Sequence, residues 1–546
     1  MAAHPYAAET FTPEERELLG HYVTNLDGPV FALVNLPEVV MGALFARYSR
    51  SSKSLRRLFL DEFVGDLDTT GDATVDATVG LRRAEDLYAR VFGDYGDDSV
   101  AQLGGVHLAC EQASNVLTKV LERSRLMSYL EQSTRYVPYD SRLASGHYRY
   151  YRDPAVLDSP LGARYVGDMD RMFDTYAALL PPLAEHLGRL HPPSGDISPI
   201  AYRQSIRARA LDALRGLLPA GSLSNVGIYG TGQSFELLLL HMRRHPLPEV
   251  RQYGEMILDE LRKVIPSFLT RIDRPDRGEV WADYLAERRD SLAALSAELW
   301  PSDELSRRGP GGAGEWAVEL VDFDPAGEEK VLVACCYPYV SCSERELADR
   351  VRRLGEAERH AILAAAVGER ANRRHRPGRA FERTSYRFDV VSDYGAFRDL
   401  QRHRMLTVEW QPLSTGLGFR VPDLVVEAGL AAPYSESLER SFALHSALAL
   451  DFPEQATYAV ALGFHIRYSL DCNAREAMHL IELRSAPQGH PAYRLIAQEM
   501  HRQIDEVAGH HALAAAMTFV DHEAVELGRL EAEQRAALRA VGAQPH

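Results

Sequence analysis

The chain has 546 residues, a length that predicts two or more domains because one hydrophobic core rarely extends over so many residues. Its composition, with 46% hydrophobic and 25% charged residues, is that of a globular protein. The net charge of −16 argues against a general nucleic-acid-binding protein, which needs a basic face, but it leaves room for a local basic pocket that binds a small anion.

Cysteine usage and hydropathy predict a cytoplasmic protein. The five cysteines form no C-x-x-C pair and show no spacing of zinc ligands, so we expect reduced thiols and no metal site. The N-terminus has no basic segment followed by an apolar one, as a signal peptide would. No apolar run approaches the ~18–20 residues of a membrane helix, so we expect no membrane partner.

Residues 10–50 are predicted to be largely helical. Thr12 and Glu15 form a capping-box pattern, and Pro13 stands at the first helical position. Residues 30–51 then place apolar side chains at helical spacing. That segment ends in Arg47, Tyr48, Ser49, Arg50 and Ser51.

A long helix is predicted to follow a turn at residues 96–100. Its apolar positions recur at helical spacing, and they are Val106, Cys110, Ala113, Val116, Leu117, Val120 and Leu121. His107 lies in the same predicted helix, where a core or surface histidine is favoured over a ligand.

Residues 123–136, RSRLMSYLEQSTRY, gather phosphate-binding side chains into one short segment. They include three arginines, a glutamate, four Ser/Thr hydroxyls and two tyrosines. Guanidinium groups bind phosphate bidentately, and hydroxyls add short charge-assisted hydrogen bonds. This segment therefore predicts a phosphate site.

Further along, helical patterns cover residues 162–190, 200–218 and 275–300, and a Gly/Pro-rich linker follows at 307–315. The tyrosine-rich stretch after Tyr136 is predicted to be irregular or a short strand. Beyond the linker the pattern begins again, with residues 316–337 predicted as strand, turn and strand.

The 123–136 segment resembles the signature of the flavin-dependent thymidylate synthases, R-H-R-x-x-S followed by x-x-E-x-S-x-R-Y. Seven of the eight specified positions match, and they are Arg123, Arg125, Ser128, Glu131, Ser133, Arg135 and Tyr136. The family histidine is Ser124 here. The resemblance implies that these seven residues bind a nucleotide.

A second block of this resemblance lies at residues 215–243. Arg215 and the proline at 219 match an arginine and a proline that precede a strand in the family, where the arginine reaches the substrate phosphate. Arg243 matches the final arginine of the next helix. The positions of the family's flavin-binding N-x-R are Gly232 and Ser234. This half therefore keeps nucleotide-binding residues and has lost flavin-binding ones.

The second half shows the opposite pattern. Its R-H-R triplet is complete, and its matches to flavin-binding positions are Glu382, Arg402, His403, Arg404, Asn473, Arg475 and His479, with Arg484 as the final arginine. Trp410 and Pro412 replace the family's glutamate and serine, and no R-Y follows. The arginine-rich run 369–383 is either a solvated face or a site for the FAD pyrophosphate.

The resemblance implies an α+β fold of two tandem domains, each a mainly antiparallel sheet with flanking helices. We expect domains at 1–300 and 316–546, joined by a linker at 301–315. Because each half lacks what the other retains, we expect joint active sites. The implied assembly is a homodimer that forms a pseudo-tetramer.

The activity implied is reductive methylation of dUMP at C5 by an FAD-dependent enzyme, with methylenetetrahydrofolate and NADPH as co-substrates. Ser133 would hold the phosphate with Arg135, and Arg243 or Arg484 would stabilise charge on the pyrimidine; these are the expected catalytic residues. Two alternatives remain open: a flavoenzyme that modifies UMP or dCMP, and a non-enzymatic descendant that binds nucleotide or flavin.

Overall fold

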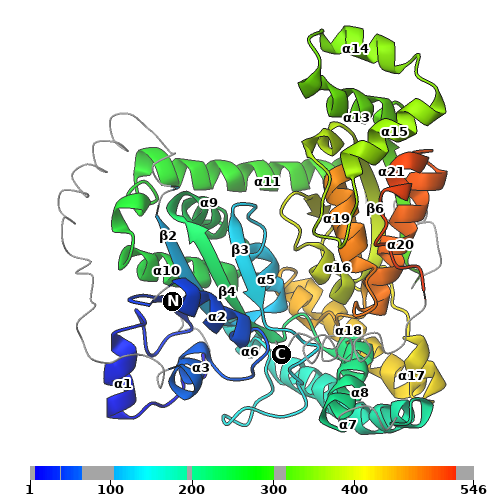
Figure 1. Cartoon of the computed structure of the whole chain (residues 1–546). Helices are drawn as coiled ribbons and strands as arrows, with labels where there is room; N and C mark the ends of the chain where they lie inside the picture. Colours follow the sequence, from blue (N-terminus) through cyan, green and yellow to red (C-terminus); the bar gives the residue numbers. More distant parts are fainter. Residues whose placement is uncertain are drawn as a thin grey trace, which may run out of the picture. The chain divides into compact units, whose positions relative to one another are not determined.

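The computed structural model describes residues 6–36, 38–63, 102, 104–193, 199–300 and 315–523 (Figure 1). The chain divides into two compact units. Unit 1 consists of Met1–Ala177, Leu218–Pro310 and Glu439–Val460, and unit 2 of Ala178–Leu217, Gly311–Leu438 and Ala461–His546. Each unit thus includes a segment from the other half of the sequence.

Unit 1 contains a four-stranded antiparallel sheet in the order β1-β2-β4-β3. The strands are β1 (Val30–Leu33), β2 (Gly105–Ser114), β3 (Met127–Glu131) and β4 (Leu223–Thr231). Its other elements are α1 (Pro13–Gly20), α2 (Glu38–Tyr48), α3 (Leu55–Glu62), α5 (Asn115–Leu121), α6 (Pro154–Leu157), the first part of α7 (Gly162–Leu190), α9 (Gly232–Arg243), α10 (Pro248–Arg262), η5 (Pro266–Leu269), η6 (Pro275–Glu279), α11 (Val280–Leu299), the last part of α18 (Ala431–Asp451) and η9 (Gln455–Ala459).

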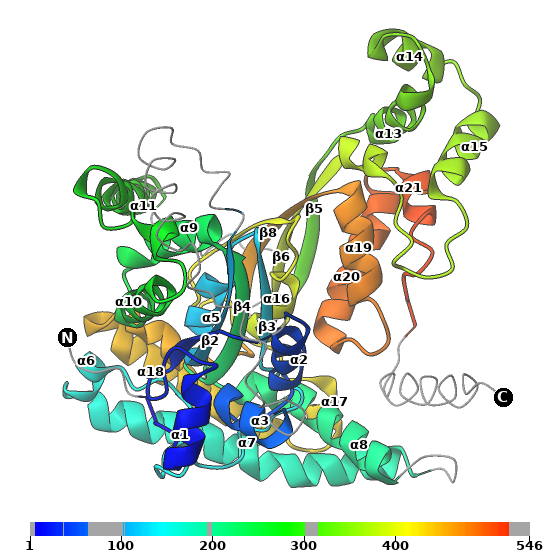
Figure 2. The same cartoon turned by 60° about the vertical axis from the view of Figure 1, so that its left-hand side comes forward.

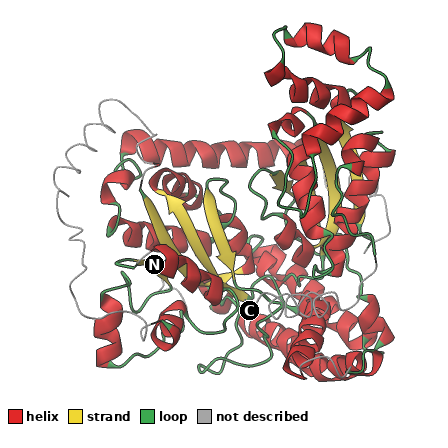
Figure 3. Cartoon of the chain, viewed as in Figure 1, coloured by secondary structure: helices red, strands yellow, loops and turns green. Residues whose placement is uncertain are grey.

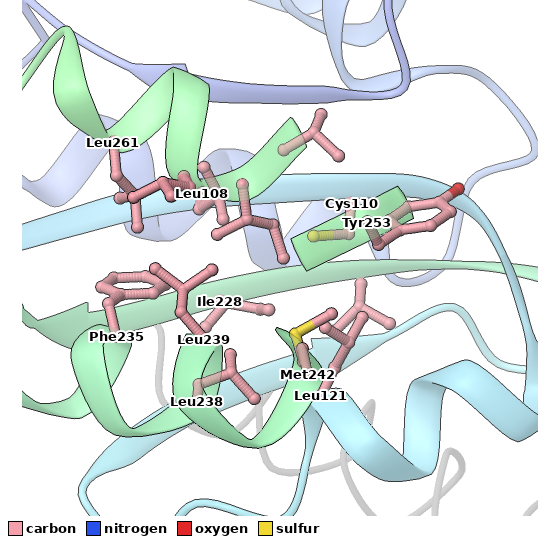
Figure 4. Close-up of a cluster of buried hydrophobic side chains, with 14 of the residues drawn as sticks. Leu108, Cys110, Leu121, Ile228, Phe235, Leu238, Leu239, Met242, Tyr253 and Leu261 are labelled. Carbon is pink, nitrogen blue, oxygen red and sulfur yellow. The ribbon is translucent and has the colours of Figure 1, made fainter. Parts of the chain in front are cut away.

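Both faces of the unit 1 sheet are buried. Alternate residues of β1 belong to different clusters: Val30 packs with α9 and α10, whereas Phe31 packs with α2 and α3. Figure 4 shows the first cluster, in which Phe235 and Leu239 of α9 meet Leu108 of β2. At the edge of this sheet, β3 carries residues 127–131 of the 123–136 segment.

Unit 2 repeats this sheet. The order β5-β6-β8-β7 corresponds to the order in unit 1, and every pairing is antiparallel. The strands are β5 (Ala317–Phe323), β6 (Ser385–Asp393), β7 (Thr407–Trp410) and β8 (His465–Asn473). Figure 2 shows α19 (Ala474–Arg484) and α20 (Pro491–Glu506) beside this sheet.

The remaining elements of unit 2 are the end of α7, α8 (Pro199–Leu214), η4 (Arg215–Leu217), α13 (Gly327–Cys336), η7 (Tyr337–Tyr339), α14 (Glu344–Val351), α15 (Glu356–Val367), η8 (Arg379–Arg383), α16 (Tyr394–Leu400), α17 (Asp423–Glu427), the first part of α18 and α21 (His511–Ala515). Figure 3 shows helices around the strands in both units. The predicted α+β class with two antiparallel sheets is confirmed. Among the described residues, no helix is long and apolar enough to cross a membrane.

Several element predictions are confirmed. The capping box of Thr12 and Glu15 is present with Pro13 at the start of α1. The helices expected at 162–190, 200–218 and 275–300 correspond to α7, α8 and the η6–α11 segment. The turn at 96–100 and most of the linker lie outside the described residues, so the domain boundary stays a prediction.

Three other element predictions are wrong. Residues 105–114 form β2 instead of a helix, so His107 lies on a strand, and the helix that follows spans only Asn115–Leu121. Residues 30–33 are also a strand, whereas 327–336 form a helix instead of a second strand. A strand buried on both faces has a continuous apolar run that cannot be distinguished from a buried helix by spacing alone.

Candidate functional site

The R-H-R triplet of the second half follows α16 in unit 2. Asp393 caps α16, its side chain accepting a hydrogen bond from Ala396 N at 2.8 Å. The helix turns the chain back along the sheet, and His403 then contacts the first turn of α19. His403 is buried, whereas Arg402 and Arg404 are exposed.

The N-cap and first two turns of α19 carry further side chains of the predicted flavin site. Asn473 caps the helix, because its Oδ1 accepts from Glu476 N at 2.9 Å. Glu476 and His479 are three residues apart and therefore share a face. Arg475 donates through Nε to Pro377 O at 2.9 Å and lies 3.6 Å from Glu382.

His403 lies between Glu476 and Arg484. Its Nδ1 is 2.9 Å from Glu476 Oε1, and Arg484 Nε donates to its Nε2 at 3.0 Å. Burial and the neighbouring guanidinium of Arg484 hold the pKa of His403 well below its usual value. The imidazole is therefore neutral at physiological pH, and burial raises the pKa of Glu476.

Arg215 also lies in unit 2, although it belongs to the first half of the sequence. Its Nη1 donates to Asp399 Oδ2 at 3.2 Å, and Arg402 donates to Asp399 Oδ1 at 2.5 Å. Arg215 is only 4% exposed, and its Nε and Nη2 have no hydrogen-bond partner. Asp399 thus joins a predicted nucleotide-binding arginine to a predicted flavin-binding one.

Gly395 makes room for this contact. A Cβ at this position would lie 2.9 Å from Asp393 Oδ1 and 3.0 Å from Arg215 Nε, closer than side chains normally approach. The first turn of α16 therefore needs a glycine where the guanidinium of Arg215 passes.

His403, Glu476 and His479 are a candidate set of metal ligands, with one ligand atom from each within 4.8 Å of the others. Arginines already occupy ring nitrogens of both histidines: Arg484 donates to His403, and Arg376 Nη2 lies 3.3 Å from His479 Nε2. Burial lowers the pKa of His479 to about 4. A cluster crowded by guanidinium groups favours an anion over a divalent cation.

The 123–136 segment lies in unit 1 as a turn, strand β3 and a loop. Arg123 and Arg125 are exposed before the strand, and Ser128 lies on it. Glu131 is buried at its end, 3.5 Å from Lys119 Nζ, which also bonds Glu122 at 2.6 Å. The predicted nucleotide-binding glutamate thus belongs to a buried charge cluster.

The loop after β3 packs on the end of α2. Ser133 N donates to Ser49 O at 3.1 Å, and Arg50 lies over the Tyr136 ring at 5.6 Å. Arg135 N donates to Ser133 Oγ at 3.3 Å. Residues 47–51 and the loop 132–136 therefore pack against each other in unit 1, and both contribute arginines and hydroxyls.

Arg243, at the end of α9, has partners in the loop after η5. Its guanidinium donates to Ile272 O at 2.6 Å and to Asp273 at 3.3 Å. To bind the pyrimidine, Arg243 would have to release Ile272 and Asp273.

The arginine-rich run has two kinds of member. Arg370 is buried in an ion pair with Glu482 at 2.6 Å, which neither sequence interpretation anticipated. Arg374 and Arg376 are exposed, and Arg376 contacts His479.

Sequence reasoning missed Asp399 and Glu476, whereas Arg376 belongs to the run 369–383 that it had singled out. Glu476 could have been found, because it lies three residues before His479 on one helix face. Asp399 is three residues before Arg402, but its contact with Arg215 is visible only in the fold. The roles assigned to the individual site residues remain predictions.

The two corresponding sheets and the sites that follow them define a protein built from two copies of one α+β domain. The chain belongs to the thymidylate synthase complementing protein family, whose model matches residues 43–267 and 319–509. The predicted family and its tandem arrangement are thereby confirmed.

Long relatives exist in distant organisms. A UPF0159 protein of Chlamydia muridarum is 40% identical over 529 residues, which is 96% of this chain and 98% of that protein. The UPF0159 protein Ta1429 of Thermoplasma acidophilum is 33% identical, with 92% and 99% covered. The tandem form is therefore shared by proteins of similar length.

Among solved structures, the chain is similar to the UMP/dUMP methylase PolB from Streptomyces cacaoi bound with 5-Br dUMP. The identity is 20% and the TM-score 0.30, with 37% of this chain and 96% of PolB covered. These values are too low for the likeness to bear on function.

Proposed function

We propose that the protein is a flavin-dependent enzyme that methylates dUMP at C5, with methylenetetrahydrofolate as the one-carbon donor and NADPH as the reductant. Membership of the family over both halves supports a methyltransferase acting on a nucleotide. The observation that carries the proposal is the contact of Arg215 and Arg402 with Asp399. Through Asp399, an arginine from the first half of the sequence lies beside one from the second half, which supports a site that uses residues of both repeats.

We propose that residues of unit 2 hold FAD. Arg376, Arg402, Arg404 and Arg475 supply guanidinium groups suited to its pyrophosphate. The buried Nε and Nη2 of Arg215, which have no hydrogen-bond partner, are donors that would suit the phosphate of the nucleotide. His403, Asn473, His479 and Glu382 would complete the site. Bound FAD would supply the redox chemistry and the one-carbon transfer.

The residues that match the family's nucleotide loop and its phosphate arginine would hold the nucleotide. Arg123, Arg125, Ser128, Glu131, Ser133, Arg135, Tyr136 and Arg215 are the proposed contacts, with Ser133 and Arg135 on the phosphate. Arg484 and Arg243 would donate to the pyrimidine carbonyls as negative charge develops there, because fixed donors cost no reorganisation during the reaction.

The test is release of tritium from C5-labelled nucleotide by the purified protein with FAD, methylenetetrahydrofolate and NADPH. We expect flavin absorbance in the protein and release from dUMP. Release from UMP or dCMP instead would favour the alternative substrates, to which Ser124 and the altered residues Trp410 and Pro412 point. Colourless protein that takes up no FAD and releases no tritium would contradict the proposal.

We also propose a cytoplasmic homodimer that acts as a pseudo-tetramer of domains. All five cysteines are free thiols, as expected in a reducing compartment. Light scattering should give twice the chain mass of 60.9 kDa. A monomeric mass with full activity would refute the dimer.

A further inference from the structure

Glu476, His403 and Arg484 form a continuous chain of hydrogen bonds inside unit 2. The Glu476 carboxylate is 2.9 Å from His403 Nδ1, and Arg484 Nε is 3.0 Å from His403 Nε2. The side chains of His403 and Glu476 are 2% and 7% exposed. Water therefore competes little with these contacts, so the geometry of each group depends on its neighbour.

The chemistry of arginine fixes the tautomer of His403. The Nε–H of Arg484 can only donate, so His403 Nε2 must be the acceptor and the ring proton must lie on Nδ1. That proton needs an acceptor in a buried site, and Glu476 provides it. Without Glu476, a ring protonated at Nε2 would direct its N–H at the N–H of Arg484.

The two ends of the chain are themselves held. The backbone of Glu476 is held by the cap of α19, because its N–H donates to Asn473 Oδ1 at 2.9 Å. The guanidinium of Arg484 also lies over the Tyr493 ring, with its Cζ 5.5 Å from the ring centre. Arg484 is thus confined between His403 and Tyr493.

We propose that Glu476 is a positioning residue, which holds His403 in the Nδ1–H tautomer and thereby orients the Arg484 guanidinium toward the substrate. This inference rests on the proposed function, in which Arg484 donates to the pyrimidine. Glu476 itself touches no reactant. Its oxygen is needed as an acceptor, and its charge is not, so Gln at this position preserves the arrangement.

The experiment compares E476M and E476Q with the wild-type holoenzyme. We expect E476M to lower kcat by about 10- to 100-fold with little change in KM, the size of loss that is typical when the partner that orients a metal-binding histidine is removed. E476Q should stay within a few-fold of wild type because its amide oxygen accepts from Nδ1–H. Equal losses in both variants, or a change confined to KM, would overturn the proposal.

Glu482 provides a matched control. It is a second buried carboxylate on α19, but it pairs with Arg370 and not with His403. E482M should destabilise unit 2 while leaving the kcat of the folded holoenzyme near wild type. A kcat loss in E482M equal to that in E476M would show that the effect is structural, which contradicts a positioning role.

Crystal structures of wild type and E476M separate this proposal from the proposed function. We expect the Arg484 guanidinium to leave His403 Nε2 in E476M and to remain there in E476Q. This result is independent of turnover, so an inactive wild-type protein would refute the proposed function alone. An unchanged Arg484 in E476M would refute the positioning role alone.

Discussion

Replacing Asp399 by alanine should remove the partner that neutralises the buried Arg215. The two groups are 3.2 Å apart, and at an effective dielectric of about 20 such charges attract by about 5 kcal/mol before desolvation is counted. Removing one member of a buried pair typically costs about 3–5 kcal/mol, because the other charge stays buried without compensation. Arg402 is more exposed and adds little.

We therefore expect D399A to lose about 3–5 kcal/mol of unfolding free energy. The double variant D399A/R215M should be more stable than D399A, because it removes the stranded charge and the two unpartnered N–H groups of Arg215 together. The measured quantity is the interaction free energy, which is the loss of stability in the double variant minus the sum of the losses in D399A and R215M.

Urea denaturation followed by circular dichroism gives these free energies. Hydrogen exchange at β6 and β8 amides assigns the loss to unit 2, since two units need not unfold in one step. D27A, which breaks the exposed pair of Arg16 and Asp27, is the control and should leave the transition unchanged. Additive losses for D399A and R215M would refute this reasoning.

Three further predictions concern packing and charge. G395A should displace Arg215 and weaken nucleotide binding by about tenfold, as measured by calorimetry. The control G42A, at an open helical site, should leave the stability of the protein unchanged or raise it. Wild-type affinity in G395A would contradict the contact. R370M should cost about 3–5 kcal/mol in urea denaturation, because it leaves Glu482 buried and unpaired, and a loss no larger than that of an exposed pair would contradict this. Burial raises the pKa of Glu249 from 4.5 to about 7, so the folded state holds a proton that the unfolded chain has released. Stability should therefore fall by on the order of 3 kcal/mol as pH rises through this window, and E249Q should abolish that slope between about pH 5 and about pH 8.

Local patterns predicted the elements that have a local cause. The capping box at Thr12 was readable because its two partners are three residues apart. The strand β2 was not readable, because Leu108 and Ala109 pack into clusters on opposite faces of the sheet. A run that is apolar on both sides has no alternation, and its spacing then resembles that of a helix.

The sequence by itself determined the family, the duplication and the inventory of chemical groups: one half carries the phosphate-type loop, and the other carries the N-x-R and histidine set. Only the tertiary structure decided which groups meet. Arg215 meets Asp399 across 184 residues, and His403 meets Glu476 across 73. Local spacing encodes the face of a helix or strand, whereas such distant contacts depend on how complete elements pack, and packing is settled by the burial of the whole chain.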